Sequence, residues 1–196
     1  KGRLVERLER HLALLGQFDT MRHTPVVAGL YDAVIDSHLV APEDRPYLRA
    51  KMAYLAYYVA SPANWSIERG YCSGNPNMSV SHLTNQGVVA ALLRDHPMAA
   101  EWAEPAVRRL QIWFDQDIGP NGEWGESQHY VHVSTGPLMG FVLAAKRAGF
   151  HDFFADGKFE SLLLYIAKMV YTAPDPQWEN RRVTAPMGRR PSGYHH

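Results

Sequence analysis

Apolar residues recur at helical spacing along almost the whole chain, and no stretch alternates with the period of two that strands require. We therefore expect an all-α domain. The first apolar stripe is formed by Leu4, Leu8, Leu12 and Leu15. Further helices are expected from Thr24 and Pro25 onward, and over about 42–60, 77–95 and 98–117. After the turn at 118–122, one more helix is expected to end at about Ala148, and a last one to cover about 158–172. Gly149 ends the helix that reaches Ala148, and Pro137 either kinks that helix or marks its start.

The composition fits one globular domain and excludes several classes of protein. The 196 residues are 46% hydrophobic, as in an ordinary globular protein. The 20 basic and 20 acidic side chains give a formal net charge of zero, so the chain lacks the overall positive charge that is typical of nucleic-acid-binding proteins. The single cysteine, Cys72, cannot form an internal disulfide, and no apolar run is long enough to span a membrane. The chain opens in helical periodicity without a signal peptide. We expect residues 1–196 to be one helical domain cut from a longer protein; His195 and His196 are native residues or remnants of a tag.

Short turns alternate along the chain with long loops, at about 61–76, 118–126 and 173–190. In an up-and-down helical array, alternate connections fall at the same end, so we expect these three loops to share one rim. Helix pairs recur about every fifty residues, which suits a toroid of antiparallel hairpins and equally a solenoid.

The long loops are rich in tryptophan, amide and arginine side chains. Indole faces stack on the apolar faces of sugar rings, while amides and guanidinium groups bind hydroxyls and carboxylates. The alternative for the tryptophans is that they only cap the ends of the core. The candidate ligand-binding residues are Trp65, Arg69, Asn75, Gln86, Trp124, Glu126, Trp178 and Arg181. Because many arginines lie in these loops, we predict a positive rim at Arg69, Arg181, Arg182, Arg189 and Arg190.

Two segments carry a resemblance to a known family. The first is Gly74-Asn75-Pro76-Asn77-Met78, and the second runs Gly122-Glu123-Trp124-Gly125-Glu126 with Tyr130 four residues on. Together they resemble the heparinase II/III-like polysaccharide lyases, in the wider group that includes chondroitin-AC and alginate lyases, over roughly residues 42–172. Many members have histidine where this chain has Met78.

The resemblance implies an incomplete (α/α) toroid, usually followed by a β-sandwich domain that this chain does not show. It also implies a secreted or periplasmic enzyme, without a cofactor, that acts on an acidic polysaccharide. The reaction would be β-elimination on a uronic acid, which requires a base, an acid for the leaving oxygen and a neutraliser of the carboxylate. By resemblance, Tyr130 is the candidate acid and base, Asn77 the neutraliser, and His129 or His82 a base or carboxylate partner.

Other interpretations of the same residues remain open. Tyr130 and His82 could be ordinary packed side chains. Glu123 and Glu126 with Asp115 or Asp117 could be the paired carboxylates of an (α/α)-barrel glycoside hydrolase that acts on uronides. A non-catalytic carbohydrate-binding domain is a third class. Glu126, His129 and His132 drift around a helix, so no metal site is expected, and no oligomeric state is predicted.

Overall fold

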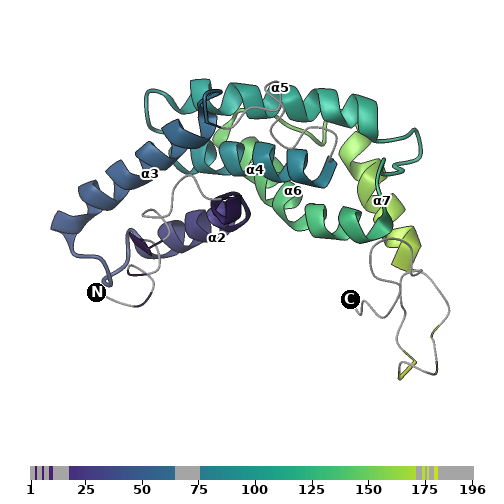
Figure 1. Ribbon diagram of the computed structural model, residues 1–196, viewed down its shortest axis with the longest axis horizontal. Coiled ribbons are helices and arrows are strands. Elements are labelled where there is room, and N and C mark those ends of the chain that lie inside the picture. Colours follow the sequence, from purple (N-terminus) through teal and green to yellow (C-terminus); the bar gives the residue numbers. More distant parts are fainter. Residues whose placement is uncertain are drawn as a thin grey trace.

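The computed structural model describes residues 18–64 and 76–170, together with a few single positions nearer the two ends. Within these ranges the chain is all-α, as expected, and the only extended pairing is one antiparallel bridge between Ile118 and Trp124. The helices are α2 (Phe18–Val34), η1 (Pro42–Asp44, a short 3-10 helix), α3 (Arg45–Ala60), α4 (Pro76–Leu92), α5 (Ala99–Asp117), α6 (Gln128–Ala148) and α7 (Lys158–Val170) (Figure 1).

Pro25, which was expected at a helix start, and Pro137, which was expected either to kink a helix or to mark its start, both lie inside helices. Helix α2 begins at Phe18, so the expected start at Thr24 and Pro25 is wrong. Helix α6 runs from Gln128 through Pro137, so Pro137 does not mark its start either. A proline inside a helix removes one backbone hydrogen bond. Burial of neighbouring side chains, such as Val27 and Leu138, compensates because tertiary packing supplies most helix stability.

Helix α4 is the central helix of the array. It contacts α2, α3, α5 and α6, and in Figure 1 it lies between α5 above and α2 and α6 below. Its contact with α6 is close, because a Cβ atom placed on Gly87 would lie 2.1 Å from the ring of Phe141. A helix surrounded on so many sides must bury almost every side chain, including polar ones.

The core has two parts that share α4 and α5. The first core cluster joins α2 and α3 to α4 and the start of α5, and it contains Tyr31, Leu55 and Trp102. The second core cluster joins α5, α6 and α7 to α4 and contains Leu110 and Phe141. Partly buried Phe150 packs against both clusters, so the two cores are continuous.

We had expected all three long loops to share one rim, but loop 61–76 begins at the other end of the molecule. Residues 118–126 and the start of α4 do lie together, on the right of Figure 1, because Asn77 and Glu126 are hydrogen bonded. Loop 61–76, however, begins at the opposite end, where Tyr57 and Ser61 line a pocket with Met98. The two ends of this loop therefore lie at opposite ends of α4, about 25 Å apart, a distance that fifteen residues can span. Most of loop 173–190 lies outside the described residues.

Candidate functional site

The candidate site is at the end of the molecule where α4 and α6 begin; we call it the α4–α6 rim. It consists of the first turn of α4, residues 117–127, and the first turn of α6. Residues 118–124 form a small hairpin, in which the Gly119 N–H donates to the Glu123 carbonyl at 2.8 Å and the Gly122 N–H to the Gly119 carbonyl at 2.9 Å. Pro120 stands at the second position of this turn, where its fixed φ is favourable.

Gly122 attaches this hairpin to α7. Its φ is +87°, which favours glycine, and a Cβ atom there would lie 2.0 Å from the Ser161 carbonyl oxygen. Only a residue without a side chain fits between the turn and the helix. The hairpin is therefore held at a fixed position, and with it the residues that lead into α6.

Glu126 connects the two halves of the rim. Its Oε2 accepts a hydrogen bond from the Asn77 backbone N–H at 3.0 Å, and its Oε1 accepts one from Asn77 Nδ2 at 2.9 Å. Asn77 is only 4% exposed and lies in the first turn of α4, where a carboxylate is favoured by the helix dipole. The two segments that carry the family resemblance are thus in direct contact.

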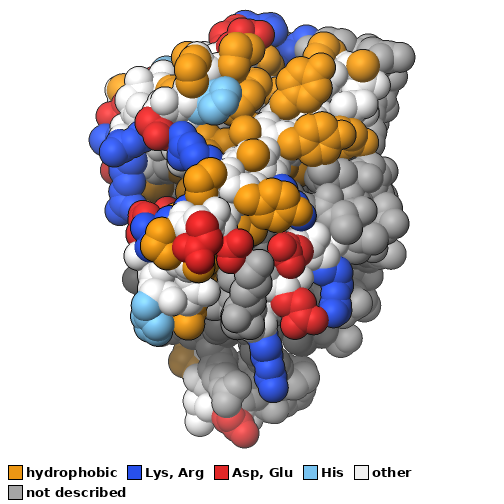
Figure 2. Space-filling view, turned by 90° about the vertical axis from the view of Figure 1, so that its left-hand side faces the viewer, with side chains coloured by type: hydrophobic (Ala, Val, Ile, Leu, Met, Phe, Trp, Pro, Cys, Tyr) orange, Lys and Arg blue, Asp and Glu red, His pale blue; other side chains and the backbone are white. Residues whose placement is uncertain are grey.

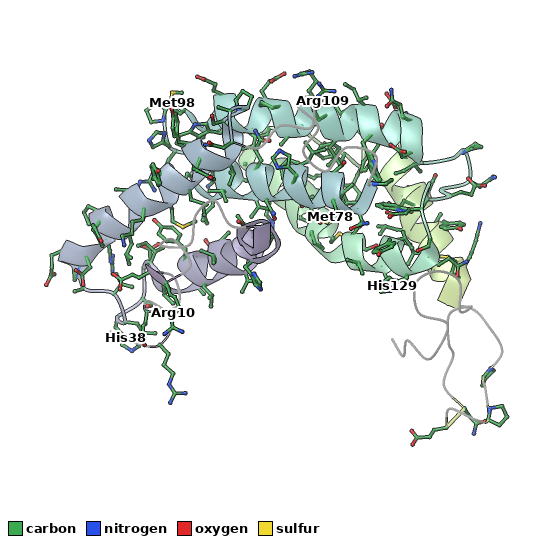
Figure 3. The ribbon with its side chains drawn as sticks, in the orientation of Figure 1. Arg10, His38, Met78, Met98, Arg109 and His129 are labelled. Carbon is green, nitrogen blue, oxygen red and sulfur yellow. The ribbon has the colours of Figure 1, made fainter. Side chains whose placement is uncertain are left out.

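His129 and Tyr130 follow within one turn of Glu126. Ser127 is the N-cap of α6, and the Tyr130 N–H donates to its carbonyl at 2.9 Å. Both rings are half-buried, with centroids 5.0 Å apart and planes tilted by 57°. Figure 3 labels His129 and Met78 at the same end of the molecule. The rim therefore gathers an imidazole, a phenol, an amide and a carboxylate.

His82 and Gln86 lie deeper than the rim. They are 3% and 4% exposed, and they stand five and nine residues into α4 from Asn77, about 7 and 13 Å along its axis. Thr84 and Asn85 are buried beside them, and sequence analysis missed both. The sequence feature that could have indicated them is the presence of polar residues at helical spacing within a helix that is otherwise apolar. The interior of α4 thus continues the polar character of the rim inward.

Trp124 is a core residue. It is 7% exposed, and its ring centroid lies 4.6 Å from that of Trp113 in an edge-on contact within the second core cluster. Its indole face is covered by protein and is not presented to a sugar. For this tryptophan, the alternative of a cap on the core agrees with the structure.

The acidic residues of the hydrolase alternative differ in their surroundings. Asn121 donates to the Glu123 carboxylate from its side-chain Nδ2 at 2.7 Å and from its backbone N–H at 2.9 Å. These hydrogen bonds hold the pKa of Glu123 below its ordinary value. Asp115 pairs with Lys158. Burial raises the pKa of Asp117, whose carbonyl accepts from the Gly125 N–H at 3.0 Å. Asp117 is thus partly buried, and not part of a fully solvated helix end.

Several candidate residues lie outside the described ranges, so the predicted positive rim is also outside them. These are Trp65, Arg69, Asn75, Trp178, Arg181, Arg182, Arg189 and Arg190. Across the described residues, no three histidine, cysteine, aspartate or glutamate side chains are grouped so as to hold a metal ion. No helix in those ranges is long and apolar enough to cross a membrane.

Comparison of the chain with known protein families, curated proteins and solved structures finds no match. The resemblance to the heparinase II/III-like lyases therefore rests on the two short segments and on the order of the helices.

Proposed function

We propose that this chain is the helical domain of a polysaccharide lyase that cleaves uronic-acid-containing polysaccharide by β-elimination. The observation that supports this most is the pair of hydrogen bonds between Asn77 and Glu126. They join residues 49 positions apart, and Tyr130 follows Glu126 by one turn at the start of α6. An incomplete toroid is part of the same proposal.

In the proposed reaction a base removes the proton on the carbon next to the uronate carboxylate. The electron pair forms a carbon–carbon double bond, the glycosidic carbon–oxygen bond breaks, and the leaving oxygen takes a proton. Tyr130 is the proposed proton donor, and its phenol can also act as base once ionised. His129, in ring contact with Tyr130, is the proposed partner in proton transfer.

Asn77 is the proposed neutraliser of the substrate carboxylate. In this structure its amide N–H and its backbone N–H both bind a carboxylate, that of Glu126. A uronate presents the same chemical group, so it would replace Glu126 at these donors. An amide is suited to this role because it adds no negative charge next to the developing enolate.

A product assay tests the proposal directly. The protein is incubated with a panel of uronate polysaccharides, including alginate, chondroitin sulfate and heparan sulfate, and ultraviolet absorbance is followed together with new reducing ends. Elimination creates an unsaturated uronide that absorbs, so both signals should rise together on at least one substrate. Reducing ends without absorbance would contradict the lyase assignment and favour hydrolysis. Binding without either signal would favour a carbohydrate-binding domain.

One observation favours the hydrolase as the second candidate. A glycoside hydrolase needs a carboxylic acid that remains protonated, and burial raises the pKa of Asp117. Its partner would be Glu126, which lies on the same rim but is hydrogen bonded to Asn77. Asp117→Asn should abolish the formation of reducing ends if this candidate is correct, and should spare elimination if it is not.

A further inference from the structure

A pocket lies at the end of the molecule opposite the α4–α6 rim, between the C-terminal end of α3 and the first turns of α5. Its volume is about 490 Å³, within the range of sites for small molecules. Along α5, Glu101 in this pocket lies about 24 Å from Asp117 at the rim, and Figure 3 labels Met98 at the pocket's end of the molecule. Its lining includes Tyr57 from α3, Met98 before α5, and Glu101, Trp102 and Glu104 from α5.

The apolar part of the lining is aromatic and held in position. Trp102 is 6% exposed, and its ring stacks on His96 with centroids 4.6 Å apart. Tyr57, by contrast, is 61% exposed, so its ring is available to a ligand. It belongs to a row of exposed tyrosines on the outer side of α3, with Tyr47 and Tyr54. Figure 2 shows hydrophobic side chains gathered on this end of the molecule, with acidic side chains among them.

The polar part of the lining is negative. Glu104 Oε1 accepts a hydrogen bond from Arg108 Nε at 2.9 Å, so its charge is offset. Glu101 makes no hydrogen bond and no ion pair with the part of the chain that the structure describes. A carboxylate in the first turn of a helix is ordinary by itself, because it suits the helix dipole. Here it also borders an aromatic pocket, and that combination points to a ligand.

The charge of the pocket excludes the substrate proposed for the rim, since a polyuronate would be repelled by Glu101. An aromatic face beside a carboxylate is the arrangement that binds an organic cation, because the ring quadrupole and the carboxylate attract the same positive charge. We propose that this pocket binds a small organic cation, an alkylammonium or guanidinium group on an apolar body. Tyr57 supplies the ring face, Glu101 the charge, and Met98 and Trp102 the apolar floor.

Calorimetric titration of the whole chain with choline tests the proposal. Choline should bind with a Kd on the order of 1 mM, and more weakly as salt is raised. The uncharged alcohol in which carbon replaces the choline nitrogen has the same shape and should bind at least about tenfold more weakly. Equal binding of the two compounds, or no choline binding up to about 10 mM, would overturn the proposal.

Two variants and one matched control locate the site. Glu101→Gln removes the charge and Tyr57→Leu removes the ring face, and each should weaken choline binding at least about fivefold. Glu43→Gln removes another exposed carboxylate, in η1, about 20 Å away along α3, and should leave the affinity unchanged. All three positions are on the surface, so circular dichroism should confirm that the variants are folded. Unchanged affinity in both pocket variants would show that choline binds elsewhere.

Discussion

The carboxylate of Glu126 connects two segments that are distant in the sequence, by accepting two hydrogen bonds from one residue, Asn77. Sequence analysis placed both residues among the candidates but gave them separate contacts with substrate. Their direct bond could not be predicted, because it depends on how the hairpin at 118–124 lies against α7. That position is set by Gly122 and its close approach to Ser161.

The first prediction concerns the stability that this bond provides. Glu126→Ala removes the carboxylate that accepts two hydrogen bonds from Asn77 and should lower the free energy of unfolding by about 1–3 kcal/mol. Urea unfolding followed by circular dichroism measures it. Glu43→Ala, at an exposed position with no such bond, should change stability by less than about 0.5 kcal/mol. Equal stability of the Glu126 variant and wild type would mean that the bond contributes nothing to the fold.

The second prediction concerns catalysis at Tyr130. Tyr130→Phe removes the transferable proton but keeps the ring, so the rate of elimination should fall at least about 100-fold while polysaccharide binding is largely retained. The product-absorbance assay measures the rate, and calorimetry measures binding. Tyr47→Phe, on the exposed side of α3, should retain full activity. Near-complete activity of the Tyr130 variant would remove this residue from the mechanism.

At the scale of elements, glycine and proline differ in how well they predict from the sequence where a helix begins or ends. Gly149 was expected to end α6, and it does so with φ +77°, while its own N–H and that of Phe150 donate to carbonyls of the last turn. Pro25 does not start α2, and of the two alternatives for Pro137 the helix start is excluded, since both helices continue through their prolines. A glycine that ends a helix acts locally. Whether a helix continues through a proline depends on how the rest of the protein packs against that helix.

The third prediction concerns the contact between α4 and α6. Gly87→Ala places a methyl group where the Phe141 ring lies, so it should destabilise the protein by about 1–3 kcal/mol. Gly140→Ala is the matched control, because this glycine is exposed in α6 and its Cβ would meet nothing within 4 Å. Alanine there should stabilise the helix by about 0.5–1 kcal/mol. Thermal unfolding measures both, and a stabilising Gly87→Ala would contradict the close helix contact.

The fourth prediction concerns pH and the junction of α3 with the turn after α4. The Arg49 guanidinium, 2.7 Å from Asp95, holds the pKa of that carboxyl below its ordinary value of 3.8. Because the folded pKa is lowered, the stabilisation is present above the ordinary value and is lost as the pH falls through the folded pKa. Asp95→Asn should therefore lower the melting temperature at neutral pH, by the equivalent of less than about 1 kcal/mol because the pair is exposed.

The difference between wild type and Asp95→Asn should disappear as the solution is acidified through that range. Asp32→Asn, at an exposed carboxylate of α2, should show no such pH-dependent difference. Melting curves over a series of pH values measure it. A difference that stays constant in acid would show that the effect of the substitution is not electrostatic.

At the scale of the whole molecule, α4 and α5 contribute to both core clusters, so the two clusters should unfold together. Leu55 lies in the first cluster and Leu110 in the second, and both are fully buried. Leu55→Ala and Leu110→Ala should each destabilise the protein by about 2–5 kcal/mol while leaving a single transition. Circular dichroism and tryptophan fluorescence should give the same midpoint. Two separate transitions would show that the clusters are independent units.

The apolar periodicity determined the all-α class and most helix positions without help from the rest of the molecule, because a helix buries a stripe that local spacing defines. The two short segments that contain Asn77, Glu126 and Tyr130 were also visible in the sequence, because polar and aromatic residues gather where a loop enters a helix. The roles of Asn77 and Tyr130 were implied by the family resemblance. Tertiary structure alone decided which loops meet. The assumption of simple hairpins placed the start of loop 61–76 on the wrong end, since a long connection lets α3 end beside Met98 and not beside Asn77. It alone also buried Trp124 against Trp113 and left Tyr57 exposed, because the exposure of an aromatic ring depends on its neighbours in space.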